Sequence, residues 1–135
     1  MTNTLQLEIV TPEATVYAEA VEMVTLPAVG GQMGVLPLHV RLVTQLVPGE
    51  LIVRKGGHED FLAVGEGLVE VTNDRVSIVT NMAVAIESID EAAAEEARER
   101  AAARLKEKLS SEEVASVNAS LARSLAQLHV KRRHH

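Results

Sequence analysis

Alternating apolar and polar residues dominate the first part of the chain. Leu5-Gln6-Leu7-Glu8-Ile9 has the two-residue period of a half-buried strand. Similar segments, separated by turn residues, predict further strands at 16–17, 21–26, 42–47, 50–55, 58–64, 68–72, 75–80 and 82–86. Gly56-Gly57 is typical of a two-residue hairpin turn. Eight to ten short strands with closely spaced turns predict an antiparallel β-sandwich or flattened barrel.

The pattern changes near Ser88. All eight Gly and all four Pro lie at or before Gly67, and the segment after Ser88 consists almost entirely of helix-forming residues. We therefore expect an α+β protein of two parts. Residues 1–87 form the antiparallel sandwich, and residues 88–135 form an antiparallel two-helix hairpin.

Both helices have N-terminal signals. The first, expected from Glu91 to Leu109, is preceded by two candidate N-caps, Ser88 and Asp90. Ser110 with Glu113 matches a capping box that starts the second. The second helix has an apolar stripe at helical spacing, made of Val114, Val117, Leu121, Leu125 and Leu128. Each helix is expected to be about 30 Å long, at about 1.5 Å per residue.

The first helix is rich in alanine and has few large apolar side chains. Alanine allows close approach but buries little apolar area. The hairpin is therefore expected to be held weakly and to move easily. The alternative is an ordinary hairpin that stabilises the sandwich.

Composition excludes several classes of protein. Apolar residues make up 47% of the chain and aromatic residues 1%, so we expect an aliphatic core, and the composition argues against a base-stacking surface for nucleic acid. The net charge of −6 disfavours binding to nucleic acid in general. There is no Cys, and the polar N-terminus lacks the basic region of a secretory signal. No apolar run is long enough to span a membrane, so membrane association requires a partner.

Catalytic and metal-binding motifs are also missing. No phosphate-binding loop, nucleophile elbow or zinc-protease motif occurs, and no Ser–His–acid set is suggested by spacing. His58-Glu59-Asp60 lies beside a tight turn, where charged residues are ordinary, so no metal site is expected. The basic end, Lys131 to His135, is expected to be solvated.

The stretch from Val29 to Gly49 has the most distinctive sequence. Three glycines at 30, 31 and 34 permit sharp turns, and Pro37 and Pro48 each end a strand. This is either a plain strand connection or a contact loop. Gly31-Gln32-Met33-Gly34-Val35-Leu36-Pro37-Leu38-His39 and the later Thr44 and Pro48-Gly49 resemble a signature of the epsilon-subunit family of rotary F-type ATP synthases.

The resemblance extends from about residue 5 to about residue 130. Three departures stand out: Gln32 replaces an acidic residue, Leu38 replaces a glycine, and Val40-Arg41 replaces Ala-Pro. The family has the same division into a β-sandwich and a helical hairpin.

The resemblance implies a non-catalytic subunit of the central stalk. Such a subunit couples proton-driven rotation of the c-ring to ATP synthesis in the catalytic head. In the family, the sandwich docks on the gamma subunit and on the ring of c subunits. The matching contact residues are Gly30, Gly31, Gln32, Met33, Gly34, His39 and Leu42. Because Gln32 stands where the family has an acidic residue, contact with the ring is expected to depend less on charge. His39 and Leu42 alternatively serve only to hold the loop.

The family's hairpin can extend towards the catalytic head and inhibit ATP hydrolysis, with basic residues facing acidic residues of the beta subunits. The alpha subunits of the catalytic head are also implied as partners. The candidates are Arg98, Arg100, Arg104, Lys106, Lys108 and Arg123. The alternative is that these are ordinary solvated charges.

Some members bind ATP on the folded hairpin through a motif close to Ile-Asp-x-x-Arg-Ala. The motif is degenerate here: Ile89, Asp90 and Ala94 match, but Ala93 replaces the arginine, and Gln127 replaces a later one. Two lost guanidinium groups remove phosphate contacts, so ATP binding is expected to be weak or absent and no other cofactor is implied.

The resemblance also implies a location on the cytoplasmic face of the bacterial inner membrane, with membrane contact only through the complex. Two other classes remain. One is a free-standing β-sandwich binding module that self-associates through its hairpin. The other is a small hydrolase, which lacks a nucleophile–base set.

Overall fold

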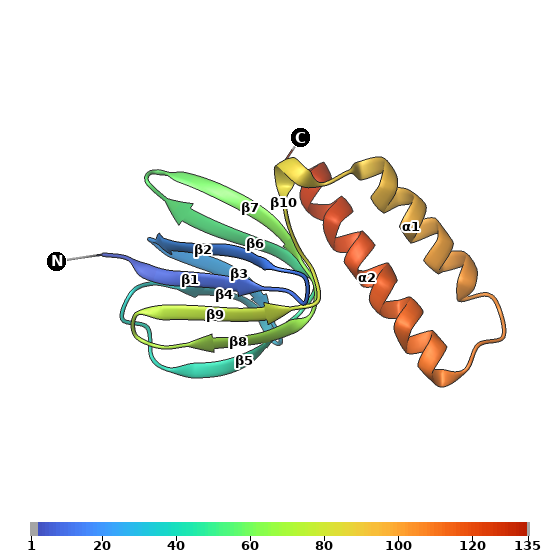
Figure 1. The fold of residues 1–135 in the computed structure, drawn as a ribbon, viewed down its shortest axis with the longest axis horizontal. Helices are drawn as coiled ribbons and strands as arrows, with labels where there is room; N and C mark the ends of the chain where they lie inside the picture. The colour runs from blue at the N-terminus through green and yellow to red at the C-terminus, as the bar shows by residue number, and fades with distance from the viewer. Residues whose placement is uncertain (1–2, 135) are drawn as a thin grey trace.

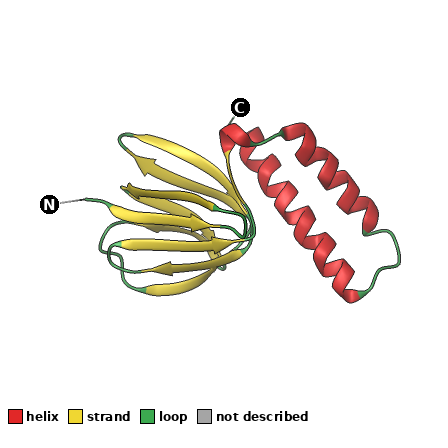
Figure 2. Ribbon diagram, viewed as in Figure 1, coloured by secondary structure: helices red, strands yellow, loops and turns green. Residues whose placement is uncertain are grey.

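The computed structural model describes residues 3–134 and has ten strands followed by two helices (Figure 1). The expected α+β class, a β-sandwich followed by a helical hairpin, is confirmed. The strands are β1 (Leu5–Val10), β2 (Thr15–Val21), β3 (Met23–Ala28), β4 (Gly31–Val35), β5 (Leu42–Leu46), β6 (Gly49–Lys55), β7 (His58–Val64), β8 (Gly67–Val71), β9 (Arg75–Thr80) and β10 (Ala83–Ala85). A 3₁₀ turn, η1 (Ile86–Ser88), leads to α1 (Glu91–Arg104) and α2 (Ser111–Arg133). Strands and helices are separated in space, as Figure 2 shows.

One sheet forms both layers of the sandwich. Its strand order is β10-β7-β6-β3-β5-β8-β9-β1-β2, with β4 paired to β3. β3 joins the layers because Met23 to Thr25 pair with β6, whereas Ala28 pairs with Leu46 of β5. The pairs are antiparallel except β1 with β9, which run parallel.

Inward-facing aliphatic residues from β1 to β9 share one core. Every second residue of a strand faces this core, as the alternating sequence requires. The side chains that are fully or almost fully buried are Leu5, Leu7, Ile9, Val21, Val24, Leu26, Val35, Leu46, Leu51, Val53, Leu62, Val64, Val69, Val71, Val76 and Ile78.

Most predicted turns are present, with shifts at strand ends. Gly56 and Gly57 both have positive φ, 60° and 81°, as a two-residue hairpin of the mirror-image type requires. The short strand expected at 16–17 is longer, because it pairs with β1 along its length. β3 continues one residue beyond Pro27 to Ala28, which pairs with β4 and β5.

The helices differ in length from the prediction. α1 ends at Arg104 rather than Leu109 and is about 21 Å long, whereas α2 is about 35 Å long. Asp90, rather than Ser88, caps α1: its Oδ1 accepts a hydrogen bond from the Ala93 N–H at 3.0 Å. The Ser110–Glu113 capping box is confirmed. The backbone N–H of Ser110 donates to Glu113 and lowers the pKa of that carboxyl group.

The apolar stripe predicted on α2 is only partly buried. Leu128 is buried, but Val114 and Leu125 are 36% and 46% exposed. Instead, Ser124, Ala126 and Val130 are buried with Leu128. α2 lies between the sandwich and α1 (Figure 1), so it has two packed faces, and its buried residues include the small Ser124 and Ala126.

Tyr17 on β2 is expected to titrate late. Burial, with the carboxylates of Glu19 and Asp60 nearby, raises its pKa from 10.0 to about 12. Because the folded pKa exceeds the unfolded pKa, the neutral phenol stabilises the fold fully below pH 10, and this contribution is lost as the pH rises towards 12. Tyr17 is the one Tyr of a chain without Trp, so tyrosinate absorbance reports it alone. The same titration in concentrated urea should have a midpoint near 10; a midpoint near 10 in the folded chain would contradict the burial of its hydroxyl group.

Candidate functional site

The glycine turn lies between β3 and β4. Gly30 and Gly31 have φ of 95° and 128°, which favours glycine. Gly30, Gly31, Gln32 and Gly34 are exposed, whereas Met33 packs against the core. Gly34 lies within β4 rather than in the turn, since it pairs with Thr25. The turn therefore presents backbone and the Gln32 amide to solvent.

The second half of the signature is a separate loop at the other end of β4. Leu38 has φ of 70°, where a side chain is strained, and is 80% exposed. Its N–H donates to the Asn73 carbonyl oxygen at 2.7 Å, which anchors the loop to the β8–β9 turn. Leu36 and Val40 are 55% and 73% exposed, so the loop is an apolar protrusion. The signature residues thus do not form one site, because Gln32 lies near the start of β4 whereas His39 lies beyond its end.

His39 and Leu42 lie beside this loop. The Nδ1 atom of His39 is 2.8 Å from the Val40 carbonyl oxygen, so the ring is turned towards its own backbone. Leu42 starts β5 and packs partly against the core. Both arrangements fit a role in holding the loop.

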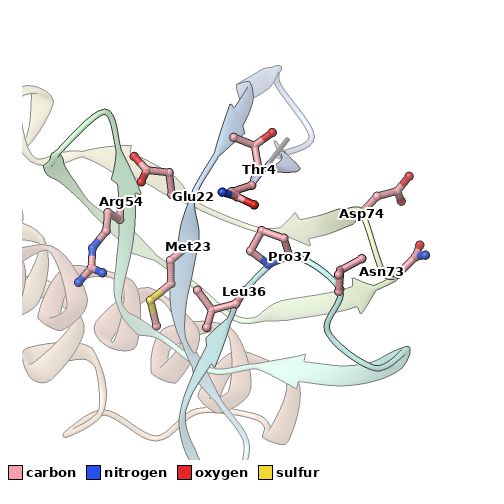
Figure 3. Close-up of a pocket in the computed structure, with 10 residues that line it drawn as sticks. Thr4, Glu22, Met23, Leu36, Pro37, Arg54, Asn73 and Asp74 are labelled. Atoms are coloured by element: carbon pink, nitrogen blue, oxygen red, sulfur yellow. The ribbon is translucent and has the colours of Figure 1, made fainter. Parts of the chain in front are cut away.

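An open cleft of about 640 Å³ lies between this loop and β3, β6 and the β8–β9 turn (Figure 3). It is lined by Asn3, Thr4, Glu22, Met23, Leu36, Pro37, Leu38, Arg54, Asn73 and Asp74. This lining contains no Ser, Cys or His.

The basic residues of the hairpin fall into two groups. Arg98 pairs with Glu95, and Arg104 pairs with Glu107 and Glu113. Hydrogen bonds from Arg98 and Arg132 lower the pKa of Glu95, so that carboxylate stays charged to lower pH. Within residues 3–134 the other group, Arg100, Lys106, Lys108 and Arg123, has no acidic partner within 4.0 Å.

Residues of the degenerate nucleotide motif contribute to the packing and capping of the hairpin. Ile89 is 5% exposed and packs with Ala63 and Val130. Asp90 caps α1, and Ala94 is buried. A hollow of about 430 Å³ does lie between the helices, with Arg100 and Arg104 in its lining.

The basic end of the chain is partly exposed, as predicted, but it is also bonded to the rest of the molecule. Each of Lys131, Arg132, Arg133 and His134 bonds to another part of the molecule, and His135 lies outside the described residues. Arg133 Nη1 is 2.9 Å from Glu50 Oε1, and the Glu50 side chain is only 4% exposed. Glu50 is not among the functional residues predicted from the sequence. The available signal was its outward position in β6, next to the inward-facing Leu51.

The described part of the chain shows neither a candidate metal site nor a helix that could span a membrane. No group of three or more His, Cys, Asp or Glu could hold a metal ion between residues 3 and 134, and His58 has only Asp60 at 3.8 Å. In the same range, neither helix is long and apolar enough to cross a membrane.

Family models match both parts of the chain. Residues 4–86 match the ATP synthase, Delta/Epsilon chain, beta-sandwich domain, and residues 87–132 match the ATP synthase, Delta/Epsilon chain, long alpha-helix domain. The two matches meet within η1, where the strands give way to helices.

Curated relatives agree over nearly the full length. The chain is 40% identical over 126 residues to an ATP synthase epsilon chain of Herpetosiphon aurantiacus, covering 93% of both chains. It is 41% identical over 128 residues to an ATP synthase epsilon chain of Halorhodospira halophila, covering 93% of this chain and 91% of that one.

A solved structure shares the fold. A chain in the Euglena gracilis mitochondrial ATP synthase, in a structure of OSCP, F1 and the c-ring, matches with a TM-score of 0.73 and 28% identity, covering 90% of this chain and 78% of that one.

Proposed function

The chain belongs to the ATP synthase epsilon chain family, and from this membership we propose how its two parts act. It is a non-catalytic subunit of the central stalk of an F-type ATP synthase, and it associates with the membrane only through that complex. We propose that residues 1–87 dock and couple, and that residues 88–135 regulate. The full-length agreement of both parts with epsilon chains is the observation that supports this.

The sandwich docks on the gamma subunit and on the c-ring. Two exposed features support two contacts: the turn at Gly30 and Gly31 with the neighbouring Gln32, and the apolar loop with Leu36, Leu38 and Val40. Because the two lie at opposite ends of β4, separate partners can occupy them. At Gln32 the contact is uncharged and should tolerate salt.

The complex is placed on the cytoplasmic face of a bacterial inner membrane. The bacterial origin of the curated relatives supports this location.

The hairpin inhibits ATP hydrolysis when it reaches the alpha and beta subunits of the catalytic head. Arg100, Lys106, Lys108 and Arg123 have no internal acidic partner among the described residues, so they can meet acidic residues without breaking an existing pair. Arg98 and Arg104 would first leave Glu95 and Glu113.

Nucleotide is not required to hold the hairpin folded. Asp90 is already engaged as the cap of α1, and Ala93 supplies no guanidinium group. This supports weak or absent binding of ATP.

We expect the purified chain to form a stable 1:1 complex with the gamma subunit of the same organism, measured by size-exclusion chromatography with light scattering. The apolar loop should carry part of this contact, so Leu38→Asp should weaken it at least about tenfold. Glu70→Gln, on an exposed position of β8, is the matched surface control. A gamma-independent dimer that Leu125→Asp dissolves would instead favour a free-standing, self-associating module.

A further inference from the structure

Only α2 of the hairpin packs extensively on the sandwich. It contacts β6, β7 and η1, whereas α1 packs along α2 on the side away from the strands (Figure 1). The apolar contact between α2 and the sandwich is small. Its buried members are Ala63, Ile89 and Val130, with Phe61, Met82, Val84 and Ile86 around them. Three buried side chains, one of them an alanine, contribute much less than the core of the sandwich, so polar contacts add to how firmly the hairpin is held.

Those polar contacts are concentrated in the last turn of α2. Lys131 Nζ donates to the Ile86 carbonyl oxygen at 3.2 Å. Arg132 bonds Glu91 at 2.8 Å and Glu95 at 2.9 Å, both at the start of α1. Successive helical residues point about 100° apart, so the last turn can reach η1, α1 and the sandwich at once.

The third contact is with Glu50. Arg133 and the Nε2 atom of His134 both bond this carboxylate, and the His134 ring stacks on Phe61 with centroids 3.8 Å apart. Glu50 lies on the outer face of the sheet, opposite Ala63 in the neighbouring strand and next to the inward-facing Leu51. Its side chain is 4% exposed because α2 covers this face.

The position of Glu50 determines what happens when this contact breaks. A buried carboxylate is tolerated only while it is paired, and losing its partners is strongly unfavourable as long as it stays buried. On an outer face, Glu50 becomes hydrated once α2 leaves. The undocked state therefore contains no buried unpaired charge, and breaking the pair favours undocking rather than unfolding of the sandwich.

We propose that Lys131, Arg132, Arg133 and His134 form, with Glu50, a clasp that holds both helices on the sandwich. Releasing the clasp frees α1 as well, because α1 is attached through α2 and the linker. The regulatory consequence rests on the inhibitory role proposed above, but the clasp itself is a property of the isolated chain.

The test measures a distance within the full chain. The chain has no Cys, so Glu59→Cys on β7 and Lys108→Cys in the α1–α2 connection supply two unique positions for spin labels. Pulsed electron spin resonance then gives the distance distribution. The clasp variants are Glu50→Ala and the double variant Arg133→Ala/His134→Ala. Their matched controls are Glu70→Gln, on an exposed position of β8, and His129→Ala, on an exposed position of α2.

We expect one narrow distance in the parent and in both controls. Each clasp variant should add a broad population, with the ratio of undocked to docked molecules raised at least about tenfold, which is about 1.4 kcal/mol. The circular dichroism of the sandwich should be unchanged. If Glu50→Ala unfolds the sandwich, the double variant alone tests the clasp, because Arg133 and His134 lie outside the strands. Parent-like distances in the double variant, with the sandwich folded, would overturn the clasp without bearing on inhibition in the complex.

Discussion

Gly67→Ala is expected to destabilise the sandwich by about 3 kcal/mol or more. Gly67 pairs with Thr80 at the start of β8. A Cβ atom at this position would lie 2.0 Å from the carbonyl oxygen of Val79 and 2.8 Å from the Cα of Thr80. Both are backbone atoms of β9 and cannot rotate away, so two paired strands would have to separate. Urea unfolding followed by circular dichroism measures the loss.

Gly34→Ala is the matched control, because it adds the same methyl group to another strand of the same sheet. There the new Cβ would lie 2.8 Å from Cε of Met23, the far end of a flexible side chain. Met23 can change rotamer, so we expect a change within about 1 kcal/mol. A loss at Gly67 as small as the loss expected at Gly34 would show that the backbone of β9 yields at Gly67.

Local patterns predict the strands well because they depend on neighbours in sequence. The alternation in Leu5 to Ile9 and the Gly56-Gly57 turn specify a strand and a hairpin without further information. The parallel pairing of β1 with β9 could not be predicted this way. Gln6 and Arg75 are far apart in the chain, and alternation is the same for parallel and antiparallel partners.

For the helices, the sequence predicts the start of α2 correctly but not which of its residues are buried. The capping box at Ser110 is a local signal and was predicted correctly. The apolar stripe was wrong at Val114 and Leu125 because it assumes one packed face. α2 packs on α1 and on the sandwich, so Ser124 and Ala126 are buried where close approach needs small residues.

The candidate site was predicted least well at the basic end. From the sequence, Lys131 to His134 were expected to be solvated, because the partners of all four side chains lie far away in the chain. Arg132 bonds Glu91, 41 positions away, and Arg133 bonds Glu50, 83 positions away. The contact residues of the sandwich and the basic residues of the hairpin stay predictions, since they concern other subunits.

Truncation after Ile89 is expected to raise ATP hydrolysis by the catalytic head with its native gamma subunit at least about fivefold, within the usual range of allosteric coupling. The shortened chain keeps the sandwich and should still bind, so the change would isolate the hairpin. Steady-state hydrolysis at saturating epsilon measures it. A matched control for charge is the full chain with Arg100→Gln, Lys106→Gln and Lys108→Gln, which should give part of the rise if these residues face acidic groups. No change on truncation would mean that the hairpin is not inhibitory.

The clasp and the truncation should change hydrolysis in opposite directions, although both remove contacts of the same hairpin. Truncation removes the inhibitory element, so hydrolysis rises. Arg133→Ala/His134→Ala leaves that element intact and undocks it from Glu50, so more molecules can reach the catalytic head and hydrolysis falls below the parent rate. His129→Ala should leave the rate at the parent value. A rise in both hydrolysis measurements would mean that the docked hairpin, rather than the released one, is the inhibitory form.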